Sequence, residues 1–394
     1  MTAVVRLTFF MGFDLRMGRG GENVLFNLLL HKPDDISITV VETDLLDSIR
    51  KQESFVDDVR KRCRLLRIHT ANYWTKNVLE QLYRDLIVRP IIRDMRILRN
   101  TGILEEIRDT DVVYLFYNHY SAFFSGMVIP VIASSHSGEV LIINKHKESI
   151  YGLIYKIYRR IYFKNVNGYH AFPKNSKDLE KLSMKYKMVL SNGVDTKLFY
   201  PDTVLNNSKV KFLFVGAMRS EKGLDILLPL IDRINGEEMD VEFHMAGTGP
   251  LVDDIKGNRK IIYHGVPGDE ELAKLYRECD VFIYPSHSDV SPQVVLEALS
   301  SGMYVLTGEY LRGNFDEFEG KYLEYIPMDV DSFYNRVMEI VRDRSIIEHD
   351  KREEYEFVRK NYDWSIIAEK FYGYMRKFYE ESKTSQSQRL QESS

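Results

Sequence analysis

The chain of 394 residues is 44% hydrophobic and 28% charged, with a formal net charge of −4. This composition excludes a largely disordered chain, and the length predicts two domains because single cores stop growing well below this size. Cys63 and Cys279 lie far apart, which excludes a disulfide framework or a cysteine metal site and suits a reducing compartment. No stretch reaches the roughly 18 uninterrupted apolar residues that a membrane span needs.

The first half alternates short apolar runs with segments of helical periodicity. This is the pattern of parallel strands joined by crossover helices. The expected strands are VVRLTFF, SITVVE, CRLLRIHT, DVVYLFY, PVIASSH, GYHAFP and KMVLSN. The first run has no cleavage region, so we interpret it as a strand rather than an export signal and expect a cytoplasmic protein.

A loop with Asn-Gly, Pro and Asn-Asn turn signals separates the two halves, and we place the boundary between residues 203 and 204. The second half then repeats the alternation. Its expected strands are KVKFLFVG, VEFHMAG, KIIYHG, DVFIYPS and MYVLTG. Each half is therefore predicted to form a Rossmann-like sheet.

Two helices are predicted after the last of these strands, from the segments DVDSFYNRVMEIVRD and WSIIAEKFYGYMRKFYEE. In the second segment Trp364, Ile367, Phe371 and Tyr374 form an apolar stripe. The polar tail, residues 382–394, is expected to be disordered.

Ligands of open α/β sheets bind beyond the carboxyl ends of the strands, so the loops there are the candidate site. The loop GAMRSEKG, residues 216–223, follows a strand and precedes a helix-like segment. Gly216 allows a tight turn, while Arg219 and Lys222 place cations at a helix N-terminus that already favours anions. The loop predicts a diphosphate site, and a solvated basic turn is the alternative interpretation.

A second loop lies before the helix-like segment QVVLEALSS. Ser291 and Pro292 predict the helix start, with the serine as cap and the proline at the first helical position. Asp289 and Glu297 have seven residues between them, a spacing that aims two carboxylates into one cleft to accept hydrogen bonds from sugar hydroxyls. Paired acids also occur in hydrolases, but the basic loop nearby fits an anionic sugar donor better.

These motifs in this order resemble the retaining GT-B glycosyltransferases of group 1, also called family four. The resemblance is close from Asn192 to Gly308 and looser in the first half. It rests on GAMRSEKG, AGTGP, GVPGDEELAKLYRECDVFIYPS and DVSPQVVLEALSSG, with GRGGENVLFNLLL and SSHSGE earlier in the chain.

The resemblance implies two Rossmann-like domains that face each other across a cleft. Residues 1–203 would form the acceptor domain and residues 204–362 the donor domain. Residues 363–381 would form a helix that crosses back to the first domain.

By resemblance, Lys222 would bind the donor diphosphate, Glu297 the ribose, and Asp289 the transferred sugar. Gly265 and Val266 would lie near the base. Gly216, Arg219, Ser291 and Pro292 complete the expected nucleotide-sugar site.

In the first half, His136 follows an apolar strand and is expected to approach the sugar. Gly20 and Gly21 would let the backbone come close to the diphosphate. They make no GxGxxG fingerprint, because the third glycine is missing. His119, His244, His264 and His287 are expected to be surface or packing residues.

The predicted reaction transfers a sugar from a nucleoside-diphosphate sugar to an acceptor hydroxyl. Retention is implied by the resemblance, and no metal, cofactor or nucleic acid is expected. Two positions depart from the family: Ala217 stands where it has Arg, and Asp289 where it has Glu. A GT-B sugar-nucleotide epimerase and a non-catalytic sugar-nucleotide-binding protein remain as alternatives.

A basic stretch, residues 60–99, interleaves arginines with Ile, Leu and Val. This mixture predicts that the stretch contacts the anionic inner face of the cell membrane, where a lipid-linked acceptor would lie. A surface helix that shows arginines to water, or a polyanionic glycan acceptor, explains the same pattern.

Overall fold

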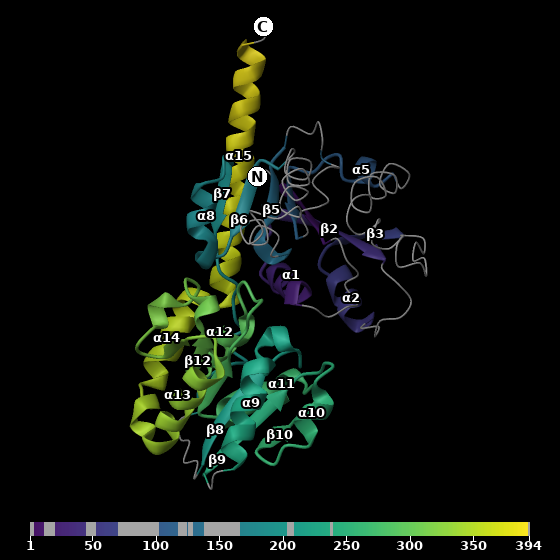
Figure 1. The fold of residues 1–394 in the computed structure, drawn as a ribbon. Helices are drawn as coiled ribbons and strands as arrows, with labels where there is room; N and C mark the ends of the chain where they lie inside the picture. The colour runs from purple at the N-terminus through teal and green to yellow at the C-terminus, as the bar shows by residue number, and fades with distance from the viewer. Residues whose placement is uncertain are drawn as a thin grey trace, which may run out of the picture. The chain divides into compact units, whose positions relative to one another are not determined.

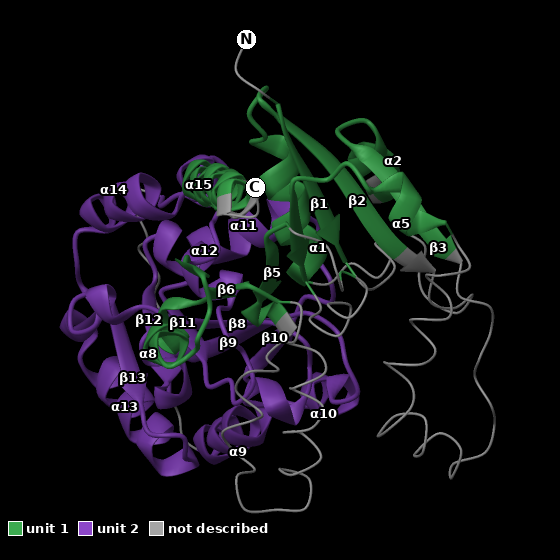
Figure 2. Cartoon of the chain, turned by 90° about the horizontal axis from the view of Figure 1, so that it is seen from above, with its two compact units in different colours: residues 1–190, 368–394 green, residues 191–367 purple. Residues whose placement is uncertain are grey.

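The computed structural model describes residues 4–11, 20–44, 53–69, 102–116, 124, 129–137, 166–202, 209–236 and 239–392. The chain forms two compact units, and each contains a parallel sheet (Figure 1). Unit 1 comprises residues 1–190 and 368–394, and unit 2 comprises residues 191–367 (Figure 2). None of the described helices is long and apolar enough to cross a bilayer.

The sheet of unit 1 has seven strands in the order β3-β2-β1-β4-β5-β6-β7, and all neighbours pair in parallel. All seven strands expected in the first half are present. They are β1 (Val5–Phe10), β2 (Ile36–Asp44), β3 (Arg64–His69), β4 (Val112–Leu115), β5 (Val131–Ser134), β6 (Gly168–Ala171) and β7 (Tyr186–Val189). The helices described are α1 (Gly20–Leu30), α2 (Glu53–Arg60), α5 (Ile103–Glu106), α8 (Ser176–Glu180) and the short η4 (Ser135–Ser137) and η5 (Pro173–Asn175).

The sheet of unit 2 has six parallel strands in the order β10-β9-β8-β11-β12-β13. The strands are β8 (Val210–Val215), β9 (Val241–Ala246), β10 (Ile261–Tyr263), β11 (Val281–Tyr284), β12 (Tyr304–Gly308) and β13 (Leu323–Ile326). The helices are α9 (Leu224–Asn235), α10 (Val252–Lys256), α11 (Asp269–Glu278), α12 (Gln293–Ser300), α13 (Val330–Arg342) and α14 (Lys351–Tyr362), with η6 (Ser220–Lys222), η7 (Glu309–Leu311), η8 (Asp316–Phe318) and η9 (Arg344–Ile347).

Central strands of both sheets are buried along their whole length. The side chains of β4, β5, β11 and β12 are all buried. Parallel strands that helices cover on both faces have this continuous apolar character, which is why the short Val- and Ile-rich runs predicted them correctly. The two Rossmann-like sheets confirm the expected GT-B fold class.

One strand, β13, was not expected. It has only four residues, and its sequence LEYI carries an acid in the interior. Glu324 is accommodated because Arg336 of α13 pairs with it and the Tyr304 hydroxyl donates to it. A run of four residues that contains a partly buried glutamate does not indicate a strand from sequence alone, because the partners of the glutamate are not known.

The long helix α15 (Trp364–Glu392) belongs to unit 1 from Ala368 onward (Figure 2). The ring of Phe371 stacks 5.9 Å from that of Phe9 and meets that of Tyr114 edge-on at 5.1 Å. The buried Tyr372 hydroxyl donates to the Leu28 carbonyl at 2.6 Å. The segment thus returns from unit 2 and fills the core of unit 1.

The tail expected to be disordered is helical as far as Glu392. Extending an existing helix fixes one residue for each new hydrogen bond, so a polar continuation needs no nucleation of its own. The Lys185 ammonium also donates to the Ser385 hydroxyl at 2.7 Å, which attaches this turn to unit 1. Composition alone could not reveal either effect.

The division between the units lies before Ser191, earlier than the expected boundary of 203/204. The segment that follows is attached to unit 2. The Asn192 amide donates to the Ser291 carbonyl at 2.8 Å, and the Phe199 side chain is buried in the core of unit 2. The turn signals Asn192-Gly193 and Pro201 marked a loop correctly, and the described part of this loop packs on unit 2.

Candidate functional site

Four loops of unit 2 line one edge of its sheet. Strands β10, β9, β8 and β11 are neighbours and run parallel, so their carboxyl ends meet at the same edge. Glycine-containing loops follow β8, β9 and β10, and a polar loop follows β11. Ligands of open parallel sheets bind at this edge.

The glycines let the first three loops touch through their backbones. Gly247 has φ of 138°, and its amide donates to the Gly265 carbonyl at 2.5 Å. A Cβ on Gly247 would lie 1.8 Å from the Gly216 carbonyl oxygen, and one on Gly249 would lie 2.5 Å from that of Met218. No larger residue fits at either place, so the loops form one rigid backbone surface.

A further glycine brings the basic loop against the loop after β11. Gly223 has φ of 92°, and a Cβ there would lie 2.2 Å from the Pro285 carbonyl oxygen. The Glu221 carbonyl accepts from the His287 amide at 3.0 Å and the Ser288 hydroxyl at 3.2 Å. These contacts hold Lys222, at the end of η6, beside the residues that follow β11.

Asp289 is the centre of a polar cluster at this point. Its Oδ1 pairs with the Lys222 ammonium. Its Oδ2 accepts from the Tyr284 hydroxyl at 2.5 Å and from the Ser286 hydroxyl at 2.7 Å. Three donors therefore hold this carboxylate, and they come from both loops.

Glu297 lies on α12 and is held by one hydroxyl. Tyr276 of α11 donates to its Oε2 at 2.9 Å. Desolvation raises the pKa of Glu297 to about 7, although the Tyr276 hydrogen bond acts in the opposite direction. Unlike a surface carboxylate, it therefore changes charge near neutral pH.

The predicted cap of α12 is wrong. The helix begins at Gln293, Pro292 is its cap residue with extended backbone, and no side chain caps it. The Ser291 hydroxyl lies one residue too early and has no hydrogen-bond partner in the part of the chain described. The extended ψ of 122° at Pro292 delays the helical turn by one residue relative to the expected start.

Three more predicted residues of unit 2 lie on the loops after β8 and β10. Arg219 is exposed and lies 3.5 Å from Glu221. Gly265 follows β10 with φ of 67°, and Val266 is 65% exposed. Val266 is therefore an exposed apolar side chain at the edge of these loops.

His136 lies in η4, directly after β5 of unit 1. Its ring stacks on that of Phe116 with centroids 5.0 Å apart and meets Phe172 and His170 edge-on. Its Nε2 is enclosed and has no hydrogen-bond partner among the described residues. Desolvation lowers the pKa of His136 well below its usual value, so the ring is neutral.

The same cluster contains a second neutral imidazole. His170 Nε2 lies 2.9 Å from the Leu190 carbonyl, and its Nδ1 lies 2.6 Å from the Tyr114 hydroxyl. The carbonyl can only accept, so Nε2 carries the proton and Nδ1 accepts from the tyrosine. Burial lowers the pKa of His170 to about 4.

Gly20 and Gly21 form the first turn of α1. Gly20 is exposed, and a Cβ there would meet no atom within 4 Å. Packing within the described part of unit 1 therefore does not require glycine at this position.

The histidines that were expected to be surface or packing residues pair with neighbouring side chains where they are described. His244 and His264 stack with ring nitrogens 3.0 Å apart, and His287 pairs with Asp225, whereas His119 lies outside the described residues. Within the described ranges, no group of three or more His, Cys, Asp or Glu side chains is placed to hold a metal ion.

The basic stretch is described only as far as residue 69. Each basic side chain in this part has a partner within unit 1: Arg60 with Asp57, Lys61 with Asp58, Arg62 with the Phe26 ring, Arg64 with Glu106 and Arg67 with Glu42. These pairs favour the interpretation as an ordinary surface for this part. Residues 70–99 lie outside the described residues.

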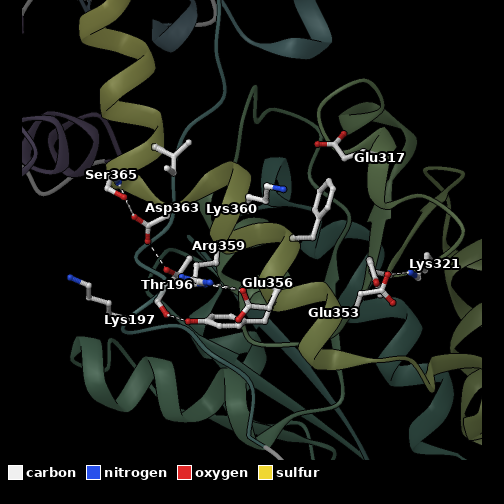
Figure 3. A pocket seen from close by; sticks show the side chains of 14 residues that line it. Thr196, Lys197, Glu317, Lys321, Glu353, Glu356, Arg359, Lys360, Asp363 and Ser365 are labelled. Carbon is white, nitrogen blue, oxygen red and sulfur yellow. Dashed lines mark hydrogen bonds and ion pairs between the residues drawn. The ribbon is translucent and has the colours of Figure 1, made fainter.

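A separate groove lies elsewhere on unit 2 (Figure 3). It has a volume of about 960 Å³, and none of the predicted site residues lines it. Two ion pairs lie along it, Lys321 with Glu353 and Arg359 with Glu356. The lining residues are Thr196, Lys197, Glu317, Lys321, Tyr322, Glu353, Tyr355, Glu356, Phe357, Arg359, Lys360, Asp363, Ser365 and Ile366.

The sequence did not single out Tyr276, Tyr284 or Ser286. Tyr284 and Ser286 lie at the start of the second candidate loop and Tyr276 in a motif that carries the resemblance, but no role was assigned to them. A signal exists for Tyr284 and Ser286, because both close a strand at the edge where the other candidates lie. Tyr276 has none, since it meets Glu297 only through the packing of α11 on α12.

Residues 209–343 match the family model of glycosyl transferases group 1. An uncharacterized glycosyltransferase of Methanocaldococcus jannaschii is 26% identical over 272 residues, 64% of this chain and 73% of that protein. A sulfoquinovosyl transferase of Arabidopsis thaliana is 28% identical over 202 residues, 46% of this chain but only 38% of that protein.

Solved structures share the fold across almost the whole chain. Sucrose-phosphate synthase of Thermosynechococcus elongatus has a TM-score of 0.71 at 16% identity, covering 95% of this chain and 99% of its own. HepE of Anabaena, in complex with UDP and glucose, has a TM-score of 0.67 at 14% identity, covering 94% and 99%. The chain is thus an enzyme of the glycosyltransferase type, with a GT-B fold and a group 1 glycosyltransferase domain at residues 209–343.

Proposed function

We propose that unit 2 binds the nucleoside diphosphate of a nucleotide-sugar and that the enzyme transfers the sugar to an acceptor hydroxyl with retention. The observation that carries this is the contact of Lys222 with Asp289 beyond the carboxyl ends of the strands, inside the group 1 domain that also contains Glu297. HepE, which shares the fold, is known in complex with UDP-glucose.

Each residue has a role that follows from its chemistry. The Lys222 ammonium and the amides at the start of α9 would bear the charge that develops on the diphosphate as it leaves. Arg219, exposed on the same loop, would reach the diphosphate from outside. Glu297 would accept from the ribose hydroxyls, because its Oε1 is left open by Tyr276.

In the reaction the bond between the anomeric carbon and the diphosphate oxygen breaks, and its electron pair stays with the diphosphate. The acceptor oxygen bonds to the anomeric carbon, and its proton passes to the departing diphosphate. Asp289 would hold the transferred sugar. His136, whose imidazole burial keeps neutral, would contact the sugar rather than the nucleotide. This proposal uses no metal and no cofactor other than the sugar nucleotide.

The acceptor is proposed to be a glycan precursor or a lipid-linked molecule. A phosphatidylinositol N-acetylglucosaminyltransferase subunit of Schizosaccharomyces pombe, 22% identical over 48% of this chain and 43% of that protein, is named for a lipid. Contact of residues 60–99 with an anionic membrane would serve such an acceptor. Sedimentation with anionic but not neutral vesicles, weakened by Arg93→Glu with Arg96→Glu, would support it, and wild-type protein left in the supernatant would exclude it.

Product analysis with a panel of UDP-, GDP- and ADP-sugars tests the proposed function. A new glycoside and a released nucleoside diphosphate are expected, with turnover reduced strongly by His136→Ala while affinity for the free nucleotide is kept. An altered donor sugar without transfer would indicate an epimerase. Binding without any turnover, with every acceptor class supplied, would indicate a sugar-nucleotide-binding protein.

A further inference from the structure

The side chain expected to bind the diphosphate is already paired. Lys222 is the basic residue of the loop after β8 that lies closest to the loop after β11, and its ammonium is bound to Asp289 Oδ1. Both side chains are largely buried, 23% and 20% exposed. Solvent screens such a pair less than it screens a surface pair.

The geometry keeps Asp289 on the lysine. Tyr284 and Ser286 both donate to the other oxygen, Oδ2, so the carboxylate is fixed with Oδ1 toward Lys222. Tyr284 is itself buried in the core at the end of β11, and its pKa is raised well above the usual value, so its hydroxyl keeps its proton and donates. Asp289 therefore cannot turn away without losing two hydrogen bonds.

We propose that Asp289 is an internal competitor for the Lys222 cation, so that binding of a nucleoside diphosphate must open or share this ion pair. The inference rests on the proposed function of Lys222 as a diphosphate ligand. Two anions would compete for one ammonium, and the affinity for the free nucleoside diphosphate would be lower than the lysine alone provides. A leaving group held less tightly is released faster after transfer, and product release limits turnover in many enzymes.

Asp289→Asn separates the pair with little change of shape. The asparagine carbonyl can keep the bonds from Tyr284 and Ser286, while its amide replaces the oxygen that faced Lys222. We expect this variant to bind UDP, GDP or ADP, whichever the wild type binds, several-fold more tightly by isothermal titration. The gain should shrink at high salt, because it is electrostatic.

A matched control removes a nearby carboxylate that does not touch Lys222. Asp225 lies on the first turn of α9 and pairs with His287. Asp225→Asn changes the net charge by the same amount, so it measures the general effect of charge on nucleotide affinity. The gain from Asp289→Asn should clearly exceed it.

A double-mutant cycle distinguishes the ion pair from simple repulsion between Asp289 and the diphosphate. If the pair must open, Asp289→Asn should improve affinity more in the wild-type background than in the Lys222→Ala background. An equal gain in both backgrounds, or no gain in the first, overturns the inference while leaving the proposed function intact. If Lys222→Ala itself does not weaken nucleotide binding, or the wild type binds none of the three nucleotides, the proposed function fails instead.

Discussion

The two units enclose different ionisable groups whose pKa values are shifted by burial. In unit 1 the enclosed groups beside β5 and β6 are His136 and His170, and desolvation lowers the pKa of both. In unit 2 they are the carboxyls Glu297 and Glu354, and desolvation raises the pKa of each to about 7. Unit 1 thus offers neutral hydrogen-bonding groups, whereas unit 2 combines acids with the Lys222 cation.

This difference suits unit 2 to binding an anion and unit 1 to contacting an uncharged hydroxyl. A diphosphate needs positive charge and backbone amides, which unit 2 supplies at one sheet edge. A neutral imidazole in an aromatic cluster can contact a hydroxyl without binding an anion. Changes in unit 2 should therefore alter nucleotide affinity, and changes in unit 1 should alter stability or turnover.

The largest expected effect concerns the dependence of unit 1 on α15. Phe371→Ala removes a buried ring that stacks on Phe9, and it should destabilise unit 1 by about 3–5 kcal/mol. Methionine oxidation in urea can follow the units separately, with Met188 reporting on unit 1 and Met303 on unit 2. Phe333→Ala in α13 is the matched control, because Phe333 lies in the core of unit 2 and its loss should be seen at Met303. A loss seen at Met303 alone for Phe371→Ala would contradict the assignment of α15 to unit 1.

The next effect concerns charge in unit 2. Lys222→Ala should weaken nucleoside diphosphate binding by about tenfold to a hundredfold, since a hydrogen bond to a charged group contributes about 1.5–3 kcal/mol. Lys274→Ala, on the exposed face of α11, removes the same charge at a distance and should change affinity little. Equal affinities for Lys222→Ala and the wild type, measured by titration calorimetry, would place the diphosphate elsewhere.

The units should also respond to pH with opposite sign. A carboxyl whose folded pKa is raised binds its proton longer in the folded state, so its contribution to stability is present below the unfolded pKa of 4.5 and is lost as pH rises through about 7. Histidines with lowered folded pKa act the other way, and stability is lost as pH falls below 6.5. From pH 5 to 8 each of these carboxyls should therefore cost unit 2 on the order of 1–3 kcal/mol.

Glu354→Gln tests this pH dependence without touching the candidate site. Glu354 is fully buried and bonds to His349 at 2.8 Å. The variant should flatten the loss of unit 2 stability between pH 5 and 8 and leave unit 1 unchanged, by the same oxidation measurement. His244 and His264, whose pKa values are lowered, oppose the trend within unit 2 and remain as the background. An unchanged slope would show that Glu354 is already ionised at pH 5.

The smallest effect concerns the support of Glu297. Tyr276→Phe removes the hydroxyl that holds this carboxyl and lowers its pKa. Nucleotide affinity should fall about two- to tenfold, since one hydrogen bond contributes about 0.5–1.5 kcal/mol, and its pH dependence should move to higher pH. Tyr355→Phe loses a comparable hydroxyl bond, to the Thr196 carbonyl, and serves as the control. A purely structural role for Tyr276 would lower stability without moving the pH profile.

The fold was predictable because its signals are local. Strands such as VVYL and VFIY are continuous apolar runs that parallel sheets require, and twelve of the thirteen strands described were expected. The glycines at 216, 223 and 265 were also recognisable as loop positions after strands. Their backbone contacts, such as that of Gly223 with Pro285, were not, because they depend on how two loops meet.

What the sequence could not predict depends on packing between distant segments. Lys222 and Asp289 were both candidates, yet nothing in their spacing indicated that they bind each other. The prediction that Ser291 caps α12 was wrong because the extended Pro292 moves the start of the helix by one residue. The prediction of a disordered tail was wrong because the helix there is stabilised by the preceding helix and by Lys185 rather than by its own composition.

Hydrogen exchange with and without nucleotide tests the central claim most directly. If unit 2 holds the nucleoside diphosphate, UDP, GDP or ADP should slow exchange in residues 216–223 and 284–297, and Lys222→Ala should abolish this protection at the same nucleotide concentration. Peptides of the separate groove around α14 should be unaffected. Protection confined to that groove, or no protection in either loop with any of the three nucleotides, would contradict the account.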